Sequence, residues 1–279
     1  MRYKTVLSII KNIAIWCISL TMMIPLLLVL INSLKDKYQA SSMGLDLPRS
    51  LHFENFLVVI EQGKLIRSFF NSMLYSGFAI VLGILLTSMA AYVLARNRTK
   101  LNRFLYFFMV LGIAMPINYV TLTKVMQFTH LNNTQIGLCL LYTATSIPFS
   151  IFLAYGFMGT IPRELDEAGI IDGCSPINLF FSVIFPLLKP VVVTMGVLNF
   201  MGVWNDFINP LYFANDASKW PMTLAVYNFF SMFSSSMSEL SGWNFVSADI
   251  VLTSLPVIII YILGQKYIIS GMTAGSVKG

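Results

Sequence analysis

Long apolar runs alternate with shorter polar connections along the whole chain of 279 residues. A helix needs about 20 apolar residues to cross the roughly 30 Å hydrocarbon core of a bilayer. Six stretches meet this requirement, and they predict membrane spans at about 12–31, 70–95, 104–126, 135–158, 190–213 and 247–268. The first two spans contain no charged residue. The pattern therefore predicts an all-α, polytopic membrane protein with six transmembrane helices.

The fifth span is less regular than the others. The apolar stretch 177–213 is too long for one straight crossing, and Lys189 and Pro190 divide it. Proline is tolerated in the first turn of a helix, and a lysine near a span can extend its ammonium group to the membrane interface. We therefore expect the span to begin close to Pro190.

Composition excludes several other classes of protein. Apolar residues make up 57% of the chain and charged residues only 11%, compared with about 25% charged in soluble domains. A soluble enzyme, a disordered chain and a disulfide-rich secreted module are all inconsistent with this balance. The net charge of +6 is spread between the apolar runs, so we expect no nucleic-acid partner. Cys17, Cys139 and Cys174 have no metal-binding spacing, and no metal site is predicted.

The distribution of basic residues predicts how the chain crosses the membrane. The connection 96–103 holds four basic residues and no acid, which is typical of a cytoplasmic loop. An even number of spans then places both termini in the cytoplasm. The basic N-terminus resembles a signal peptide, but its apolar run is about 20 residues long and has no cleavage site, so we expect an uncleaved first span.

The cytoplasmic connection 159–189 has a pattern of its own. Acidic residues follow Pro162, which is typical of the first turn of a helix. Gly173 is a natural helix end, and the pair Ser175-Pro176 is typical of a new helix start. Two short helices should therefore meet at Gly173. On this pattern alone, an amphipathic connector lying on the inner leaflet is an equally good interpretation.

A sequence motif distinguishes this loop. Residues 167–173 read Glu-Ala-Gly-Ile-Ile-Asp-Gly, and Ile184-Phe185-Pro186 follow. The segment resembles the EAA loop of the permease subunits of binding-protein-dependent ABC importers. That family pattern runs Glu-Ala-Ala, two residues, Asp-Gly-Ala, and then Ile-x-Leu-Pro. Gly169, Cys174 and Phe185 depart from it by small or apolar replacements.

The resemblance extends over nearly the whole chain. The last residues, 265–279, and the segment 204–211 are similar to the sugar-transporting, MalG-type branch of the same family. The resemblance implies the type I ABC importer permease fold and one permease domain over 1–279. Its parts would be a first span at 12–31, a core of five spans within 70–268, the EAA coupling loop at 159–189 and a cytoplasmic tail at 269–279.

Family membership also implies partners. These are a second homologous permease, two copies of an ATP-binding cassette ATPase, an extracytoplasmic sugar-binding protein and a di- or oligosaccharide substrate, all at a bacterial cell membrane. The chain has no phosphate-binding loop of the type that holds ATP, so ATP and Mg²⁺ would bind the ATPase and no cofactor would bind this chain. We expect a transport subunit that is not an enzyme and has no catalytic residues.

The resemblance and the chemistry of the side chains give three groups of candidate site residues. The first group would couple the permease to the ATPase: Glu167, Ala168, Gly169, Asp172, Gly173 and Pro186. The second would bring the tail into contact with the ATPase: Gly271, Gly275, Lys278 and Gly279. The third would line the sugar path: Asn199, Trp204, Asn205, Asp206 and Asn209. Polar groups inside a membrane span usually face a cavity or a partner, although Trp204 also fits an interfacial aromatic belt.

Two rival classes follow from the same composition. A secondary, ion-coupled transporter would usually have internal repeats and ionisable residues in mid-span, and neither is evident. A membrane-embedded enzyme would need a cluster of catalytic groups, but His52 and His130 are far apart and the acids lie mainly in loops.

Overall fold

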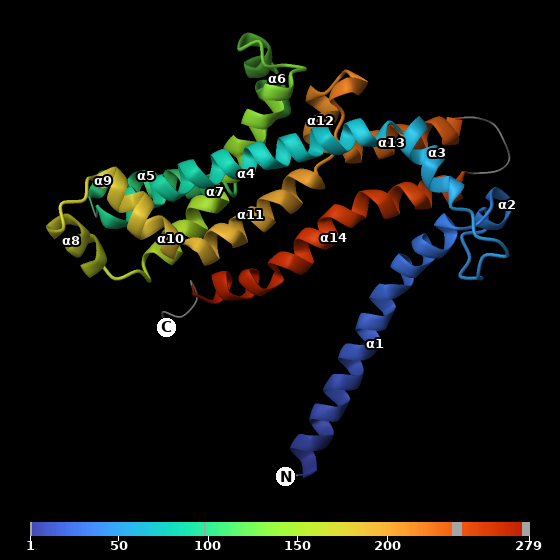
Figure 1. Cartoon of the computed structure of the whole chain (residues 1–279), viewed down its shortest axis with the longest axis horizontal. Coiled ribbons are helices and arrows are strands. Elements are labelled where there is room, and N and C mark those ends of the chain that lie inside the picture. Colours follow the sequence, from blue (N-terminus) through green and yellow to red (C-terminus); the bar gives the residue numbers. More distant parts are fainter. Residues whose placement is uncertain (1, 98, 236–241, 275–279) are drawn as a thin grey trace. The chain divides into compact units, whose positions relative to one another are not determined.

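The computed structural model describes residues 2–97, 99–235 and 242–274. Helices and their connections account for these residues, and no strand occurs among them (Figure 1). The prediction of an all-α fold is confirmed. The described chain divides into two compact units, one formed by Met1–Ile66 with Ala225–Leu255 and the other by Arg67–Leu224 with Pro256–Gly279.

The helices are α1 Arg2–Ser33, α2 Lys37–Ala40, α3 Glu54–Gln62, α4 Leu65–Arg96, α5 Lys100–Leu111, α6 Tyr119–Phe128, α7 Gln135–Met158, α8 Glu164–Ile171, α9 Pro176–Asn178, α10 Phe185–Leu187, α11 Lys189–Trp204, α12 Ile208–Phe213, α13 Met222–Ser235 and α14 Trp243–Ala274. A π-helical turn, η1, covers Leu179–Ile184, and a 3₁₀ turn, η2, covers Ala217–Lys219. These two turns complete the sequence of elements in the described part of the chain.

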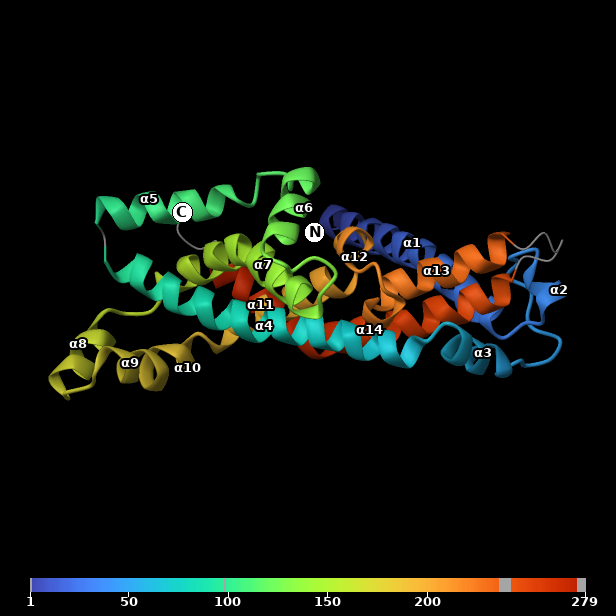
Figure 2. The same ribbon diagram turned by 90° about the horizontal axis from the view of Figure 1, so that it is seen from above.

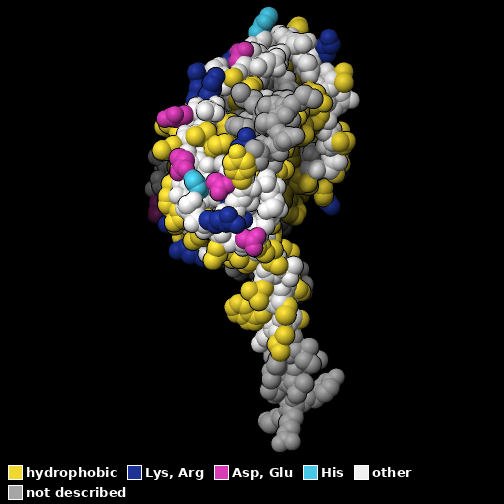
Figure 3. All heavy atoms as spheres, turned by 90° about the vertical axis from the view of Figure 1, so that its right-hand side faces the viewer, with side chains coloured by type: hydrophobic (Ala, Val, Ile, Leu, Met, Phe, Trp, Pro, Cys, Tyr) yellow, Lys and Arg dark blue, Asp and Glu magenta, His cyan; other side chains and the backbone are white. Residues whose placement is uncertain are grey.

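The first unit combines an exposed apolar helix with a hydrogen-bonded loop. Apolar side chains are prominent on the described part of α1 in Figure 3, and its residues 11–31 are exposed or half-buried within the chain, whereas Asn32 and Ser33 at its end are buried. After α1, the Asn55 amide donates to the carbonyls of Ser33 and Lys35, at 2.9 Å each. Asn244 of α14 donates in turn to the Asn55 side chain at 2.8 Å. These bonds satisfy the backbone of a loop that would otherwise lie exposed beyond the end of α1.

Four of the predicted spans correspond to single long helices. The matching segments are Lys11–Ser33, Leu65–Arg96, Gln135–Met158 and Trp243–Tyr267. A fifth candidate is the pair Pro176–Leu187 and Lys189–Trp204, which bends by 76°. Helix α11 begins at Lys189, so the predicted division of this apolar stretch at Lys189 and Pro190 is confirmed. The bend falls at Leu188, which is fully buried.

The third predicted span, 104–126, is two short helices in the structure. Helix α5 ends at Leu111 and α6 begins at Tyr119. Pro116, in the intervening segment, has no N–H to continue a helix. The Asn118 side chain accepts a hydrogen bond from the Thr121 N–H and starts α6 instead. Local chemistry in 112–118 thus interrupts a stretch that is long enough by hydropathy alone.

The fifth predicted span, 190–213, is interrupted as well. Helix α11 ends at Trp204 and α12 starts at Ile208, with Asn205, Asp206 and Phe207 between them. All these elements belong to the second unit, in which α7 packs on α11 and α5 lies beside α7 (Figures 1 and 2). The break in the apolar stretch therefore brings a carboxylate close to α7.

Candidate functional site

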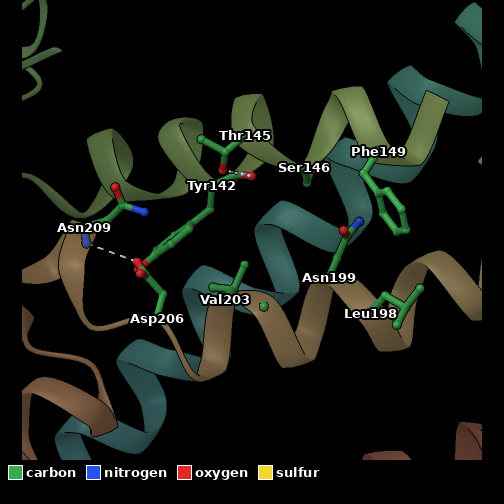
Figure 4. A pocket seen from close by; sticks show the side chains of 10 residues that line it. Tyr142, Thr145, Ser146, Phe149, Leu198, Asn199, Val203, Asp206 and Asn209 are labelled. Carbon is green, nitrogen blue, oxygen red and sulfur yellow. Dashed lines mark hydrogen bonds between the residues drawn. The ribbon is translucent and has the colours of Figure 1, made fainter. Parts of the chain in front are cut away.

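A cavity of about 270 Å³ lies between α7 and the broken segment α11–α12. Figure 4 shows the side chains of α7 and of α11–α12 converging on it. Its polar lining consists of Tyr142, Thr145, Ser146, Asn199, Asp206 and Asn209. Phe149, Leu198, Gly202 and Val203 complete the lining. Polar groups and two aromatic rings, those of Tyr142 and Phe149, thus share a small space within otherwise apolar helices.

Asp206 is the hydrogen-bonding centre of this cavity. The Tyr142 hydroxyl donates to the Asp206 carboxylate at 2.8 Å. The N–H groups of Ile208 and Asn209 donate to the same carboxylate at 3.2 Å each, so Asp206 caps the start of α12 (Figure 4). A carboxylate at a helix N-terminus satisfies free N–H groups and is favoured by the helix dipole. The interrupted span thereby fixes one charged group beside the cavity.

Two amides add further hydrogen-bonding capacity. Asn199 is 8% exposed and its Nδ2 donates to the Ser150 hydroxyl at 3.2 Å. Asn209 is also 8% exposed, and its Oδ1 accepts no hydrogen bond within the described structure. A buried carbonyl oxygen without a donor is unfavourable, because it has lost its water. Asn209 is therefore ready to accept a bond from a hydroxyl group in the cavity.

Three of the five candidate path residues meet here. Asn199, Asp206 and Asn209, which all belong to the segment α11–α12, line the same cavity. Trp204 and Asn205 lie outside its lining. The Trp204 ring is buried and stacks on Phe200, with centroids 5.2 Å apart, while Asn205 is exposed at the end of α11.

The contribution of α7 was missed by the sequence analysis, which treated 135–158 as a plain apolar span. Tyr142, Thr145, Ser146 and Phe149 follow one another at intervals of three, one and three residues. This spacing places them on one face of a helix. A stripe of hydroxyl groups within a span was the available signal.

The cytoplasmic motif forms a well-defined helix end. Gly173 has a φ of +80°, and its N–H bonds to the Ile170 carbonyl at 3.0 Å. The Cys174 N–H bonds to the Gly169 carbonyl at 2.9 Å, which completes a Schellman motif. The Ser175 hydroxyl then accepts from the Asn178 N–H and starts α9. The predicted helix end at Gly173 and restart at Ser175 are both confirmed.

Substitution of Gly173 should loosen this turn. A Cβ in the left-handed region costs about 1 kcal/mol, which corresponds to roughly fivefold in an opening equilibrium. We expect amide hydrogen exchange in 170–178 to quicken about fivefold in Gly173→Ala. Gly173→Asn is the matched control, since asparagine tolerates this conformation better. Equal exchange in Gly173→Ala and the unchanged protein would contradict the role assigned to the glycine.

Helix α8 is anchored to the end of α4 by its acidic side chain Asp166. The Tyr92 hydroxyl donates to Asp166 Oδ1 at 2.7 Å. Arg96 Nη2 lies 2.8 Å from Asp166 Oδ2, and both side chains are only 13% exposed. Arg96 also donates to the Ile161 carbonyl at 3.1 Å. We call Tyr92, Arg96 and Asp166 the α4–α8 clamp. In the sequence, Asp166 is one of the acidic residues that follow Pro162 and are typical of a helix start, and its contact with α4 was not predicted.

The two faces of α8 differ. Asp166 and Gly169 are buried, whereas Leu165, Ala168 and Asp172 are exposed. A Cβ at Gly169 would lie 2.4 Å from Leu179 Cδ1, so the missing side chain lets η1 pack closely on α8. The opposite face exposes Glu167 together with apolar residues, of which Ile171 is 85% exposed.

The other end of α4 holds the loop after α12. Asn71 Nδ2 donates to the carbonyls of Ser218 and Trp220, at 2.9 and 3.0 Å. Lys219 pairs with Asp216 at 2.7 Å, and this hydrogen bond is the main cause that lowers the pKa of Asp216. The carboxylate therefore stabilises the loop at neutral pH, and this contribution is lost as the pH falls through its lowered pKa.

Two of the remaining candidate residues lie in described helices. Pro186 is in α10, two residues before the bend at Leu188. Gly271 lies in α14, while Gly275, Lys278 and Gly279 are outside the described residues. Within the described ranges, no group of three His, Cys, Asp or Glu side chains could hold a metal ion.

The fold and these features define a class of protein. The structure is similar to a chain of "a bacterial ABC transporter involved in the import of the acidic polysaccharide alginate", with a TM-score of 0.85. The alignment covers 96% of this chain and 98% of that one at 20% sequence identity. At this identity the likeness defines the fold, which is that of an ABC importer permease.

Comparison of sequences gives the family. The family "Binding-protein-dependent transport system inner membrane component" matches residues 79–274. This chain belongs to that family and is a multi-pass membrane protein. The resemblance seen in the EAA motif is thereby confirmed.

Two curated relatives are similar over nearly their full length. The probable starch degradation products transport system permease protein AmyC of Thermoanaerobacterium thermosulfurigenes is 31% identical, over 94% of this chain and 93% of the relative. The melibiose/raffinose/stachyose import permease protein MelC of Bacillus subtilis is 34% identical, over 92% and 91%. Both are named as transport permeases.

Proposed function

We propose that this chain is one of two permease subunits of an ATP-driven importer and forms half of the path for a di- or oligosaccharide. Membership of the binding-protein-dependent transport family supports the importer. The sugar class is supported by the relatives, which are named for starch degradation products and for melibiose, raffinose and stachyose. The chain contributes transport rather than catalysis.

The cavity at the broken span is the observation that carries this proposal. Interrupted membrane helices supply free backbone and polar side chains at substrate sites of transporters. Here the break supplies Asp206 and Asn209, which can accept bonds from sugar hydroxyls. The ring of Phe149 offers an apolar surface for the C–H face of a sugar. The cavity lies against α7 and α11 of one subunit, so a second permease would complete the path.

The coupling segment would connect this path to ATP hydrolysis. The exposed face of α8 presents Glu167 and apolar side chains to an ATPase, while its buried face is joined to α4 by the clamp. ATP and Mg²⁺ would bind the ATPase, because the sequence has no phosphate-binding loop. When the ATPase dimer closes, α8 would move as a unit and carry the end of α4 with it.

This assignment also orients the chain. The coupling helix would face the cytoplasm, as would both termini and the tail residues Gly271 to Gly279. The opposite end, with the loop held by Asn71, would face the sugar-binding protein. A second solved structure, similar in fold with a TM-score of 0.62 at 12% sequence identity, is described as a "bacterial alginate ABC transporter in complex with alginate pentasaccharide-bound periplasmic protein", which supports a partner of this kind.

Co-purification tests the proposal. The tagged chain would be isolated in mild detergent from cells of its own host, and the proteins bound to it identified by mass spectrometry. We expect a second permease, an ATPase and an extracytoplasmic sugar-binding protein. A chain that purifies alone, and that carries a sugar in vesicles without ATP, would contradict the proposal and indicate a secondary transporter.

Glu167 should be needed for the ATPase contact. Its side chain is exposed and forms no ion pair among the described residues, so its removal leaves the fold of α8 intact. A charged hydrogen bond at a subunit interface contributes about 1.5–3 kcal/mol, which corresponds to more than tenfold in affinity. We expect Glu167→Ala to retain at least tenfold less ATPase on the affinity column. Glu164→Ala is the matched control on the same helix, and equal loss in both would show a general effect of acidic charge.

A further inference from the structure

A second cavity, of about 460 Å³, lies where α4 ends and α5 begins, against α7. Its polar, basic and aromatic lining residues are Asn97, Lys100, Arg103, Tyr106, Phe107 and Tyr155. It shares no lining residue with the cavity around Asp206. None of these residues belongs to the proposed sugar path or to the proposed contact with the ATPase.

The cavity is cationic and its charge is not neutralised. Lys100 and Arg103 both line it, and no acidic residue does. In the part of the chain that the structure describes, neither side chain has a carboxylate within ion-pair distance. The nearby Arg96 differs, because it is paired with Asp166. Two unpaired cations beside one cavity favour an anion there.

Aromatic rings give the cavity firm walls. Tyr106 stacks on Tyr155 with ring centroids 3.9 Å apart, which joins α5 to α7. The Arg103 guanidinium lies 5.9 Å from the centre of the Phe107 ring, within the range of a cation–π contact. The first contact fixes α5 against α7 beside the cavity, and the second places the Arg103 guanidinium next to Phe107, which also lines the cavity.

The outer face of α5 is apolar. Leu101, Phe104, Phe108 and Leu111 are all more than half exposed. Their spacing of three, four and three residues places them on one helix face. Lipid chains are the natural environment of such a face in a membrane protein. The cations at the start of α5 therefore lie at the level where lipid chains meet their headgroups.

We propose that this cavity binds the headgroup phosphate of an anionic phospholipid, with Lys100 and Arg103 as its cationic ligands. The acyl chains would lie along the apolar face of α5. Asn97 and Thr99 offer further polar atoms near the phosphate. The clamp places this end of α4 beside α8, so the lipid belongs to the cytoplasmic leaflet in the orientation given under the proposed function, on which this step rests. Basic pockets between membrane helices on the cytoplasmic side bind anionic headgroups in this way.

Native mass spectrometry of the purified transporter, with the subunits that accompany it, tests this site. Phosphatidylglycerol and phosphatidylcholine of equal chain length would be added separately to the delipidated protein. We expect retained phosphatidylglycerol to exceed retained phosphatidylcholine, and Lys100→Gln with Arg103→Gln to weaken phosphatidylglycerol binding about tenfold or more. The charge-preserving pair Lys100→Arg with Arg103→Lys should bind as the unchanged protein does, which separates loss of charge from loss of folding.

Three results would overturn the proposal. Lys64→Gln with Lys124→Gln removes two exposed lysines elsewhere, and an equal loss of lipid in this control would show only nonspecific attraction. Unchanged lipid binding by the Lys100→Gln and Arg103→Gln protein would place the lipid elsewhere. Full displacement of the lipid by millimolar inorganic phosphate would assign the cavity to a free anion instead.

Discussion

Asp166→Asn should strongly reduce sugar uptake while the protein still reaches the membrane. The asparagine oxygen can still accept from Tyr92, but Arg96 loses the charge that lies 2.8 Å away. Fully buried pairs cost about 3–5 kcal/mol to break and exposed pairs less than 1, and we expect about 2 for this pair at 13% exposure. Loosening α8 from α4 by this amount should lower uptake tenfold or more, while ATP hydrolysis continues.

A double-mutant cycle separates the clamp from a general effect of either residue. Uptake and ATP hydrolysis would be measured in Asp166→Asn, Arg96→Gln and the protein with both changes. Residues in contact should show an interaction energy of about 1 kcal/mol or more, because the second substitution removes a partner already lost. Strictly additive losses would contradict the clamp, and so would parallel losses of uptake and hydrolysis.

Asp206→Ala should have the second large effect, on the sugar path itself. The change removes the cap of α12 and leaves the Tyr142 hydroxyl without its acceptor. A lost N-cap costs about 0.5–2 kcal/mol and an unsatisfied buried donor about 1–3. We expect at least a tenfold fall in uptake, measured with the assembled transporter in vesicles.

Asn205→Ala is the matched control for this position. It removes a neighbouring polar side chain that is exposed and lies outside the cavity. Uptake by this variant should stay within twofold of the unchanged protein. Equal losses in the two variants would show that the break between α11 and α12 matters only for folding, and the cavity would lose its role.

The sequence alone predicted the ends and starts of helices where a single residue type determines the local structure. Gly173 at the end of α8 and Ser175 at the start of α9 follow from backbone conformation and capping. The position of α11 followed from Lys189 and Pro190. In each case the chemistry is local, so no distant part of the chain could change the outcome.

The sequence alone did not predict where membrane spans are interrupted or which residues far apart in the chain are in contact. Hydropathy predicted one span over 104–126 and another over 190–213, but side-chain caps at Asn118 and Asp206 start new helices within them. The bond between Tyr142 and Asp206 joins residues 64 positions apart. The clamp joins Tyr92 to Asp166 over 74 positions. No helical periodicity contains such information.

ATP-dependent uptake by the purified assembly is the most direct test of the central claim. Vesicles containing the transporter and its sugar-binding protein would be offered radiolabelled melibiose, raffinose or maltotriose, with ATP present or absent on the side of α8. We predict accumulation of at least one sugar only with hydrolysable ATP. Accumulation at an undiminished rate without ATP, driven by an ion gradient, would contradict the account.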